Sequence, residues 1–326
     1  MAQALNYYLE HFGLRERPFA LAPDPEFIFW SPEHRGAFAM LDYGLSTRAP
    51  ITLLTGEIGA GKTTLLHHFI DSLGEGVTIG MISNARPGVN DVLRRVCAAL
   101  GLSAAPGADS ADLFEVIQSF LQAEHRQGRH VLLIIDEAQN RGRDALEDLR
   151  MLTNINAGRD EVLQLLLVGQ PELRAVVRRP DLVQFAQRVS ASYHLPRLDA
   201  ASTAGYIASR VRQAGGNPNI FSRQAAELIH EATGGVPRLI NQLCDLALTY
   251  AYAAQATMVK RDTVAQVLAD GVTKADALDA SQIADAIRNN ALETLLKSLR
   301  FESNGDLVDP QIWLYQVVNG EFQQVQ

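Results

Sequence analysis

The stretch Gly56-Glu57-Ile58-Gly59-Ala60-Gly61-Lys62-Thr63 decides how this chain folds. An apolar run at residues 51–54 precedes it and predicts a buried strand, while residues 64–70 have the apolar spacing of a helix. The spacing G-x-x-x-x-G-K-[ST] between a strand and a helix is that of a phosphate-binding P-loop. A glycine-rich turn that matches by chance is the alternative, and the two flanking elements favour the P-loop.

Each position of this stretch has a chemical reason. Glycines let backbone N–H groups surround phosphate oxygens because no Cβ stands in the way. The N-terminus of the following helix adds partial positive charge at the same place. Lys62 is expected to reach the β and γ phosphates, and the Thr63 hydroxyl to coordinate Mg²⁺. The predicted phosphate-binding set is Gly56, Glu57, Gly59, Ala60, Gly61, Lys62, Thr63 and Thr64.

The composition is that of a globular protein with a buried core. The chain has 326 residues, 47% hydrophobic and 20% charged, which is enough for two domains. A net charge of −8 disfavours a uniformly basic nucleic-acid binder but allows a local basic patch. Cys97 and Cys244 lie in apolar helical patterns and predict buried free thiols. No signal-peptide pattern and no apolar run near the ~20 residues of a membrane span are present.

The second strong motif is Val131-Leu132-Leu133-Ile134-Ile135-Asp136-Glu137. A continuous apolar strand is what a parallel sheet covered on both faces requires. It ends in two carboxylates, at the sheet edge where open α/β sheets place their chemistry. Asp136 is expected to hold Mg²⁺ through water, and Glu137 to act as general base toward water, a contribution of roughly 10²–10⁴-fold. The alternative, a strand ending in a solvated acidic turn, is disfavoured by the P-loop upstream.

A third polar position follows the apolar strand predicted at residues 162–168. Gln170 would lie at the same sheet edge as Asp136, where it could orient the attacking water or touch the γ-phosphate. A simple turn residue before Pro171 is the alternative. The stretch after it is rich in arginine, which suits bidentate contacts to phosphate or carboxylate but can also belong to a solvated face: Arg174, Arg178, Arg179 and Arg188.

The remaining elements up to residue 198 alternate between helices and strands. Ser31-Pro32 predicts a helix start, Asn90 a helix cap, and Ser110 or Asp112 the start of another helix. Further strands are predicted at residues 77–82 and 190–195 and further helices at 32–47, 91–100, 110–126 and 144–153. The pattern predicts an α/β domain at residues 31–198, with a parallel sheet and helices on both faces.

Residues 1–30 are rich in aromatic residues and proline, which excludes a long helix. They are too apolar for a free tail, so we expect them to wrap across the first domain. Alternatively, residues 12–19 line an adenine pocket.

After Pro196 the strand-like runs stop until the far C-terminus. Helices are predicted at residues 200–214, 222–234 and 237–252 and after a cap at Asp262, which describes a small helical lid at residues 199–271. In the extension at residues 272–326, the spacing at 281–299 predicts an amphipathic helix and residues 311–318 predict a short strand. Docking or self-association and simple packing are both open roles for this extension.

Together these features resemble the AAA+ ATPase architecture: a P-loop, a strand ending in Asp-Glu, a polar residue after a later strand, and a helical lid. Over residues 5–270 the chain resembles the ExeA/GspA-like secretion ATPases in a set of short motifs. Relatives of that family include exopolysaccharide-locus and pilus-biogenesis ATPases and, more distantly, transposition ATPases. The motifs are Tyr8-Leu9-Glu10-His11-Phe12-Gly13-Leu14, Pro18-Phe19, Pro23-Asp24-Pro25, Asp136-Glu137-Ala138-Gln139, Gly169-Gln170-Pro171-Glu172-Leu173, Gln187-Arg188, Tyr193-His194-Leu195 and Gly234-Gly235-Val236-Pro237-Arg238-Leu239-Ile240-Asn241, followed by Leu243-Cys244-Asp245.

The resemblance implies ATP and Mg²⁺ as ligands and adds three residue roles. Gln170 resembles the sensor 1 residue, and Arg238 resembles sensor 2, a lid arginine that contacts ATP of its own subunit. Arg188 is matched to the arginine finger, which reaches ATP on a neighbouring subunit and can contribute about 10³–10⁵ in rate. Such a finger requires a head-to-tail contact, which closes into rings or continues as helices. The family therefore implies a homo-oligomer, ring-shaped or helical and hexamer-like.

Two functions remain in competition. The first is an oligomeric ATPase that drives assembly or remodelling of a protein partner in secretion, pilus or polysaccharide export. The second is an ATP-dependent DNA-binding regulator resembling the transposition ATPases, favoured by the arginine-rich stretch and weakly opposed by the net charge of −8. A non-hydrolysing interaction module is disfavoured by the intact set of Lys62, Asp136, Glu137 and Arg238. The expected location is the cytoplasm, with recruitment to the inner membrane by a partner as an alternative.

Overall fold

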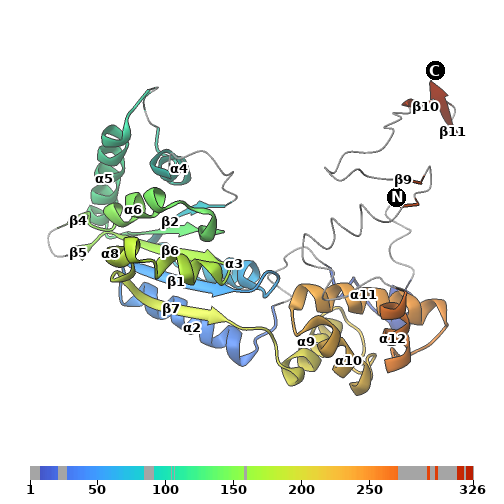
Figure 1. The fold of residues 1–326 in the computed structure, drawn as a ribbon. Helices are drawn as coiled ribbons and strands as arrows, with labels where there is room; N and C mark the ends of the chain where they lie inside the picture. Colours follow the sequence, from blue (N-terminus) through green and yellow to red (C-terminus); the bar gives the residue numbers. More distant parts are fainter. Residues whose placement is uncertain are drawn as a thin grey trace. The chain divides into compact units, whose positions relative to one another are not determined.

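A computed structural model describes residues 8–20, 28–83, 92–103, 105, 107–157 and 160–270, with the backbone of four short strands beyond residue 291 (Figure 1). The chain divides into two compact units, Met1–Asp270 and Gly271–Gln326. Within the described residues, no helix combines the length and apolarity needed to cross a membrane.

The first unit is built on a five-stranded parallel sheet with the strand order β2-β3-β6-β1-β7. Its strands are β1 (Ile51–Gly56), β2 (Val77–Ile82), β3 (His130–Ile135), β6 (Leu163–Gly169) and β7 (Val189–Leu195). Strand β6 lies between β1 and β3, so the segment after β6 leaves the sheet between the P-loop and the two carboxylates. Because these three adjacent strands are parallel, all three predicted motifs lie at the edge formed by the carboxyl ends of the strands.

Helices cover both faces of this sheet (Figure 1). Along β3, the side chains of Val131, Leu133 and Ile135 pack into the core under one layer of helices, and those of Leu132 and Ile134 pack into the opposite core. The first layer contains α4 (Val92–Ala99), α5 (Ser110–Arg126) and α6 (Arg143–Leu152); the second contains α2 (Pro32–Ser46) and α3 (Lys62–Asp71). Burial on both faces explains the uninterrupted apolar strands and confirms the expected α/β fold class.

Capping side chains mark the starts of several helices. The Ser31 hydroxyl caps α2 by accepting a hydrogen bond from the backbone N–H of His34, with Pro32 at the first helical position, as expected. Helix α5 begins at Ser110, one of the two predicted starts, and Asp109 before it is the cap and forms a capping box with Asp112. The predicted cap Asn90 lies outside the described residues. Short elements complete the sheet domain: η3 (Ala138–Asn140), β4 (Asn156–Ala157), β5 (Asp160–Glu161), α7 (Glu172–Val177), η4 (Pro180–Leu182) and α8 (Val183–Ala186).

Four helices follow β7, and we call them the four-helix segment: α9 (Ala200–Gln213), α10 (Arg223–Thr233), α11 (Pro237–Ala253) and α12 (Arg261–Ala269). Ser222 caps α10, which ends at Gly234 in the left-handed conformation, as expected. Helix α12 begins earlier than predicted, with Lys260 at the cap position. Asp262 therefore lies in the first turn, where its negative charge interacts favourably with the helix dipole and stabilises the helix. The predicted boundary at residue 198 stays a prediction.

The N-terminal stretch packs on the four-helix segment. The short helix α1 (Leu9–Phe12) and the residues after it share a core with α9–α12, through Tyr8, Leu9, Phe12, Leu14 and Phe19. Tyr8 and Arg17 both donate hydrogen bonds to Asp245 on α11, and burial raises the pKa of Tyr8. The expectation that this stretch wraps across the sheet domain is therefore wrong for residues 8–20, because its apolar side chains fill the core of the helices instead.

The described backbone of the second unit is extended. Strand β8 (Leu292–Glu293) pairs antiparallel with β9 (Ser298–Leu299), and β10 (Leu314–Val318) pairs antiparallel with β11 (Glu321–Val325). The strand predicted at residues 311–318 is confirmed for β10. The helix predicted at 281–299 is wrong where the backbone is described, because strand pairing overrides a helical spacing of leucines.

Candidate nucleotide-binding site

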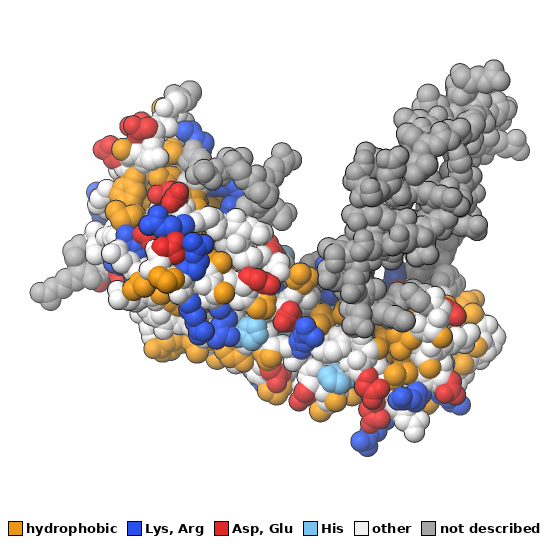
Figure 2. Space-filling view, in the orientation of Figure 1, with side chains coloured by type: hydrophobic (Ala, Val, Ile, Leu, Met, Phe, Trp, Pro, Cys, Tyr) orange, Lys and Arg blue, Asp and Glu red, His pale blue; other side chains and the backbone are white. Residues whose placement is uncertain are grey.

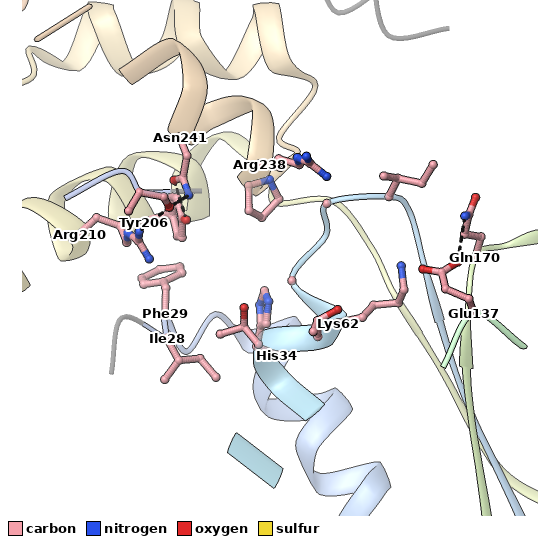
Figure 3. A pocket seen from close by; sticks show the side chains of 17 residues that line it. Ile28, Phe29, His34, Lys62, Glu137, Gln170, Tyr206, Arg210, Arg238 and Asn241 are labelled. Carbon is pink, nitrogen blue, oxygen red and sulfur yellow. Dashed lines mark hydrogen bonds between the residues drawn. The ribbon is translucent and has the colours of Figure 1, made fainter. Parts of the chain in front are cut away.

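A cavity of about 490 Å³ opens beside the P-loop (Figure 3). The P-loop and the carboxyl ends of β3 and β6 line one end of it, which we call the phosphate end. The four-helix segment and residues Ala20, Ile28 and Phe29 line the other, which we call the base end. The volume lies within the range of small-molecule sites, roughly 300–1,000 Å³.

The P-loop turns sharply between β1 and α3. Gly59 and Gly61 have φ values of 77° and 96°, a region that residues with a Cβ rarely adopt. A Cβ on Gly59 would stand 2.7 Å from the Cβ of Arg238, and one on Gly61 would stand 3.0 Å from Nε2 of His34. Glycine is thus needed both for the backbone conformation and for the close approach of two other helices.

The Lys62 ammonium is buried in this loop. Its Nζ donates to the carbonyl oxygens of Gly56, at 2.7 Å, and Glu57, at 2.9 Å. Burial lowers the pKa of Lys62, while the carboxylates of Glu137 and Asp136 act in the opposite direction. A cation held by weakly basic carbonyls at a helix N-terminus is well placed to exchange them for anionic phosphate oxygens.

The two carboxylates after β3 differ in environment. Asp136 does not line the cavity; its Oδ1 accepts a hydrogen bond from the backbone N–H of Glu137 at 2.9 Å, and burial raises its pKa. Glu137 does line the cavity and has a left-handed backbone, with φ 51° and ψ 41°. That conformation costs a residue other than glycine about 1–2 kcal/mol. Backbone strain of this kind clusters at functional sites.

Glutamine side chains hold the Glu137 carboxylate. Gln170 donates from Nε2 to Glu137 Oε2 at 3.2 Å (Figure 3), so the residue after β6 meets the one after β3, as the sheet order requires. Gln139 on η3 donates to the same oxygen. The role of Gln139 was not predicted, although it stands in the quoted Asp136-Glu137-Ala138-Gln139 motif.

The donor set fits a magnesium nucleotide. Thr63 lines the cavity, and Asp136 lies near enough to Lys62 to influence its pKa. In the part of the chain that the structure describes, no group of three His, Cys, Asp or Glu side chains could hold a metal. Mg²⁺ needs no such group, because one carboxylate, a hydroxyl, water and phosphate oxygens satisfy it.

The base end is formed by side chains that the motifs do not mark. Tyr206 donates its hydroxyl to Oδ1 of Asn241 at 2.8 Å, and Asn241 Nδ2 donates to the carbonyl of Ala20 at 3.4 Å. Phe29 packs edge-on against the Tyr206 ring at 5.8 Å. None of residues 12–19 lines this cavity, as the adenine-pocket hypothesis required; Ala20, Ile28 and Phe29 lie there instead. The residues that do line the cavity belong to the same N-terminal stretch and lie later in the sequence than the predicted ones.

His34 is a further cavity residue that was not predicted. It occupies the first turn of α2, where its Nδ1 lies 2.8 Å from the Ser31 hydroxyl, and its ring hydrogen bonds to the backbone of Ala60. Burial lowers the pKa of His34. The side chain thus connects the start of α2 to the P-loop.

The two predicted arginines lie in different places. Arg238, at the start of α11, lines the cavity, and its backbone N–H donates to the Gly59 carbonyl at 3.3 Å. Arg188 is outside the cavity and donates from Nη1 to the backbone carbonyl and the hydroxyl of Thr153, at 3.1 and 3.2 Å. Strands β1 and β7 are parallel neighbours. Arg188 precedes β7 and the P-loop follows β1, so Arg188 lies at the amino ends of the strands and the P-loop at their carboxyl ends.

The other predicted residues support the loop. Gly56, Glu57 and Ala60 do not line the cavity, although the first two carry the carbonyls that hold Lys62. Glu57 also forms an ion pair with Arg197 at 3.7 Å.

Comparison with known proteins agrees with this geometry. A family model described as an AAA domain matches residues 46–177, which include the P-loop, Glu137 and Gln170. General secretion pathway protein A of Aeromonas hydrophila is 38% identical over 246 residues, which are 76% of this chain and 45% of that protein. Residues 46–177 match an AAA domain. The expected resemblance to the ExeA/GspA-like family is confirmed.

A second relative is the Mu-like prophage FluMu DNA transposition protein B of Haemophilus influenzae, 30% identical over 169 residues, or 52% of this chain and 53% of that protein. The chain spans about half the length of these two curated relatives. Among solved structures, the Aeropyrum pernix ORC2 protein superposes with a TM-score of 0.57 at 18% identity, covering 78% of this chain and 72% of its own. Drosophila ORC bound to DNA gives 0.56 at 15% identity, with coverage of 84% and 69%. These structures share the fold.

Proposed function

We propose that this chain binds ATP with Mg²⁺ in the cavity and hydrolyses it. The observation that carries the proposal is the meeting of three separate segments at the phosphate end: Lys62 from the P-loop, Glu137 after β3 and Gln170 after β6 (Figure 3). A cation, a carboxylate base and a neutral amide are the groups that phosphoryl transfer to water requires.

Each residue has a distinct task in this proposal. Lys62 binds the terminal phosphates, and Thr63 with Asp136 would hold Mg²⁺, which when bound offsets negative charge on the phosphate oxygens. Glu137 accepts a proton from the attacking water, and Gln170 orients that carboxylate. Arg238 reaches the nucleotide from the start of α11. Its backbone bond to Gly59 ties its position to the P-loop.

We further propose that Arg188 acts on a neighbouring copy of the chain. Its place at the edge of the sheet opposite the P-loop keeps it from the cavity of its own chain, so a role in hydrolysis requires a head-to-tail contact. The resulting homo-oligomer would be a ring or a helix, hexamer-like in its geometry.

The proposed work of the oligomer is assembly or remodelling of a protein partner in secretion, pilus or polysaccharide export. The support is the 38% identity to general secretion pathway protein A over 246 residues. Residues 272–326 are proposed to serve docking or self-association.

Mixing two variants tests the proposal. Glu137→Gln should bind ATP without hydrolysing it, and Arg188→Ala should also be inactive, each with a rate at least 10²-fold below wild type. An equal mixture should recover about a quarter of the wild-type rate, because sites arise that pair an intact Glu137 with an intact Arg188 from the next subunit.

Three results would contradict the proposal separately. Full activity of Glu137→Gln refutes the role of Glu137 as general base. Full activity of Arg188→Ala refutes the role of Arg188 in hydrolysis on a neighbouring subunit. A mixture that remains inactive, although both variants bind ATP, refutes the contact between subunits.

DNA binding is the second candidate function. Arg174 and Arg178 are exposed on and after α7, and a DNA transposition protein matches half of the chain. Figure 2 shows, however, that basic side chains on this unit are interspersed with acidic ones, and Arg179 is paired with Asp181 at 2.9 Å. If DNA is bound, the ATP-dependent affinity should fall steeply with salt and weaken in an Arg174→Ala, Arg178→Ala double variant. An absence of binding at low salt dismisses this candidate.

A further inference from the structure

The side chain of Gln139 bridges two segments of the site. Its Nε2 donates to Oε2 of Glu137 at 2.5 Å, and its Oε1 accepts a hydrogen bond from the backbone N–H of Gln170 at 3.1 Å. Chemistry fixes this orientation of the amide, because an ionised carboxylate can only accept a hydrogen bond and a backbone N–H can only donate one. Gln139 is therefore hydrogen-bonded to the Glu137 carboxylate through its Nε2 and to the residue after β6 through its Oε1.

The network closes through Gln170. Its Nε2 donates to the same Oε2 of Glu137 at 3.2 Å, so one carboxylate oxygen accepts from two amides. In Figure 3 the Glu137 carboxylate lies between Gln170 and Lys62 and extends toward Lys62. Two donors on one oxygen fix the rotation of the carboxylate and leave its other oxygen available to a water molecule.

The end of β6 is shaped to admit the Gln139 amide. A Cβ on Gly169 would stand 2.6 Å from Oε1 of Gln139 and 2.8 Å from Cδ2 of Leu173. The missing side chain therefore lets the amide reach the backbone N–H of the next residue. The left-handed backbone of Glu137, with φ 51°, turns the chain from β3 into η3, which carries Gln139.

We propose that Gln139 is the positioning residue for Glu137: it holds the carboxylate in the orientation that accepts a proton from water and couples that orientation to Gln170. This inference rests on the proposed ATP hydrolysis. Gln139 acts through Glu137 and is not itself a catalytic residue. A carboxylate at position 139 could not replace it, because two like charges would face each other where a donor is needed.

The first test compares Gln139→Ala with Asn140→Ala. Asn140 lies on the same short helix with an exposed side chain and serves as the matched control. In Gln139→Ala, kcat should fall roughly 10–100-fold, the usual loss when the partner that orients a reactive group is removed. The KM for ATP and the affinity for ATP should stay at wild-type values, because Gln139 is not among the residues that line the cavity.

Two readouts separate positioning from general structure. A crystal structure of Gln139→Ala should show the Glu137 carboxylate rotated or in more than one orientation, with the P-loop unchanged. Gly169→Ala should reproduce the loss of kcat, because the new Cβ displaces the Gln139 amide while the amide itself remains.

A double-mutant cycle with Gln170→Ala tests the coupling. The two single losses should combine less than additively, because both amides hold the same oxygen. Additive losses overturn the coupling. An unchanged or higher kcat in Gln139→Ala overturns the positioning role, and a higher one would instead reveal a restraint on Glu137. If Glu137→Gln itself retains activity, the proposed function has failed, and that result is distinguishable from a failure of Gln139 alone.

Discussion

The phosphate end and the base end of the cavity are built in different ways. At the phosphate end, the groups come from short contiguous segments at the carboxyl ends of parallel strands, and backbone geometry places them. At the base end, the groups meet across long distances in the sequence: Arg210 donates to the carbonyl of Pro18, 192 positions away, and Asn241 donates to that of Ala20, 221 positions away. The first end depends on local spacing and the second on how the N-terminal stretch packs.

This difference predicts separable effects of substitution. Changes at the phosphate end should affect every ligand that carries a triphosphate. Changes at the base end should affect only ligands that carry a base as well. Inorganic tripolyphosphate, which has phosphates and no base, therefore serves as the probe that distinguishes the two ends.

The largest effect is expected for Lys62→Ala. Loss of the charge-assisted bonds should lower the affinity for ATP and for tripolyphosphate alike, by about 10–100-fold. Calorimetric titration measures both, with Lys260→Ala as control, since Lys260 is an exposed lysine at the start of α12. If the affinity for ATP falls while the affinity for tripolyphosphate does not, Lys62 is not where tripolyphosphate binds, and this prediction is wrong.

A smaller effect is expected for Arg210→Met. The Arg210 side chain is only 6% exposed and donates from Nε to the Pro18 carbonyl at 2.6 Å. Methionine preserves most of the volume but leaves that buried carbonyl without its partner, which should lower the free energy of unfolding by about 1–3 kcal/mol. Denaturant unfolding measures this, with the exposed Arg212→Met as control.

The same substitution should weaken ATP binding severalfold and leave tripolyphosphate binding unchanged, because the N-terminal stretch loses its attachment to α9. Equal losses for the two ligands would show that the ends are not separable.

The two ends also differ in how far the sequence predicts them. Lys62, Thr63, Glu137 and Gln170 were all expected at one sheet edge, because strand periodicity and motif spacing are local properties and parallel strands end together. All four line the cavity. Gln139 was missed although it is only two residues after Glu137. The sequence shows that a glutamine stands there, but not which two groups its amide contacts.

The base end could not be predicted in the same way. Tyr206 and Asn241 lie at ordinary positions of amphipathic helices, and nothing in their spacing distinguishes a cavity residue from a core residue. The N-terminal aromatic residues were recognised as packing residues, but hydrophobicity has no direction and does not say which core they fill. Only the fold shows that they pack on α9–α12.

The smallest effect, and the sharpest test of the comparison, is expected for Tyr206→Phe. The substitution keeps the ring that packs against Phe29 and removes only the hydroxyl that donates to Asn241. One neutral hydrogen bond is worth about 0.5–1.5 kcal/mol, so ATP affinity should fall roughly 2–10-fold. Tripolyphosphate affinity and kcat should not change. Tyr43→Phe is the control, because that tyrosine is 54% exposed.

A selective loss of ATP affinity in Tyr206→Phe means that the hydroxyl orders Asn241 at the base end, and that the helices recognise the base independently of the phosphates. A matching loss of tripolyphosphate affinity means that the Tyr206–Asn241 bond holds the whole four-helix segment over the P-loop, because only then could a change at Tyr206 reach a ligand without a base. In that case the backbone bond from Arg238 to Gly59 becomes the connection between the two ends.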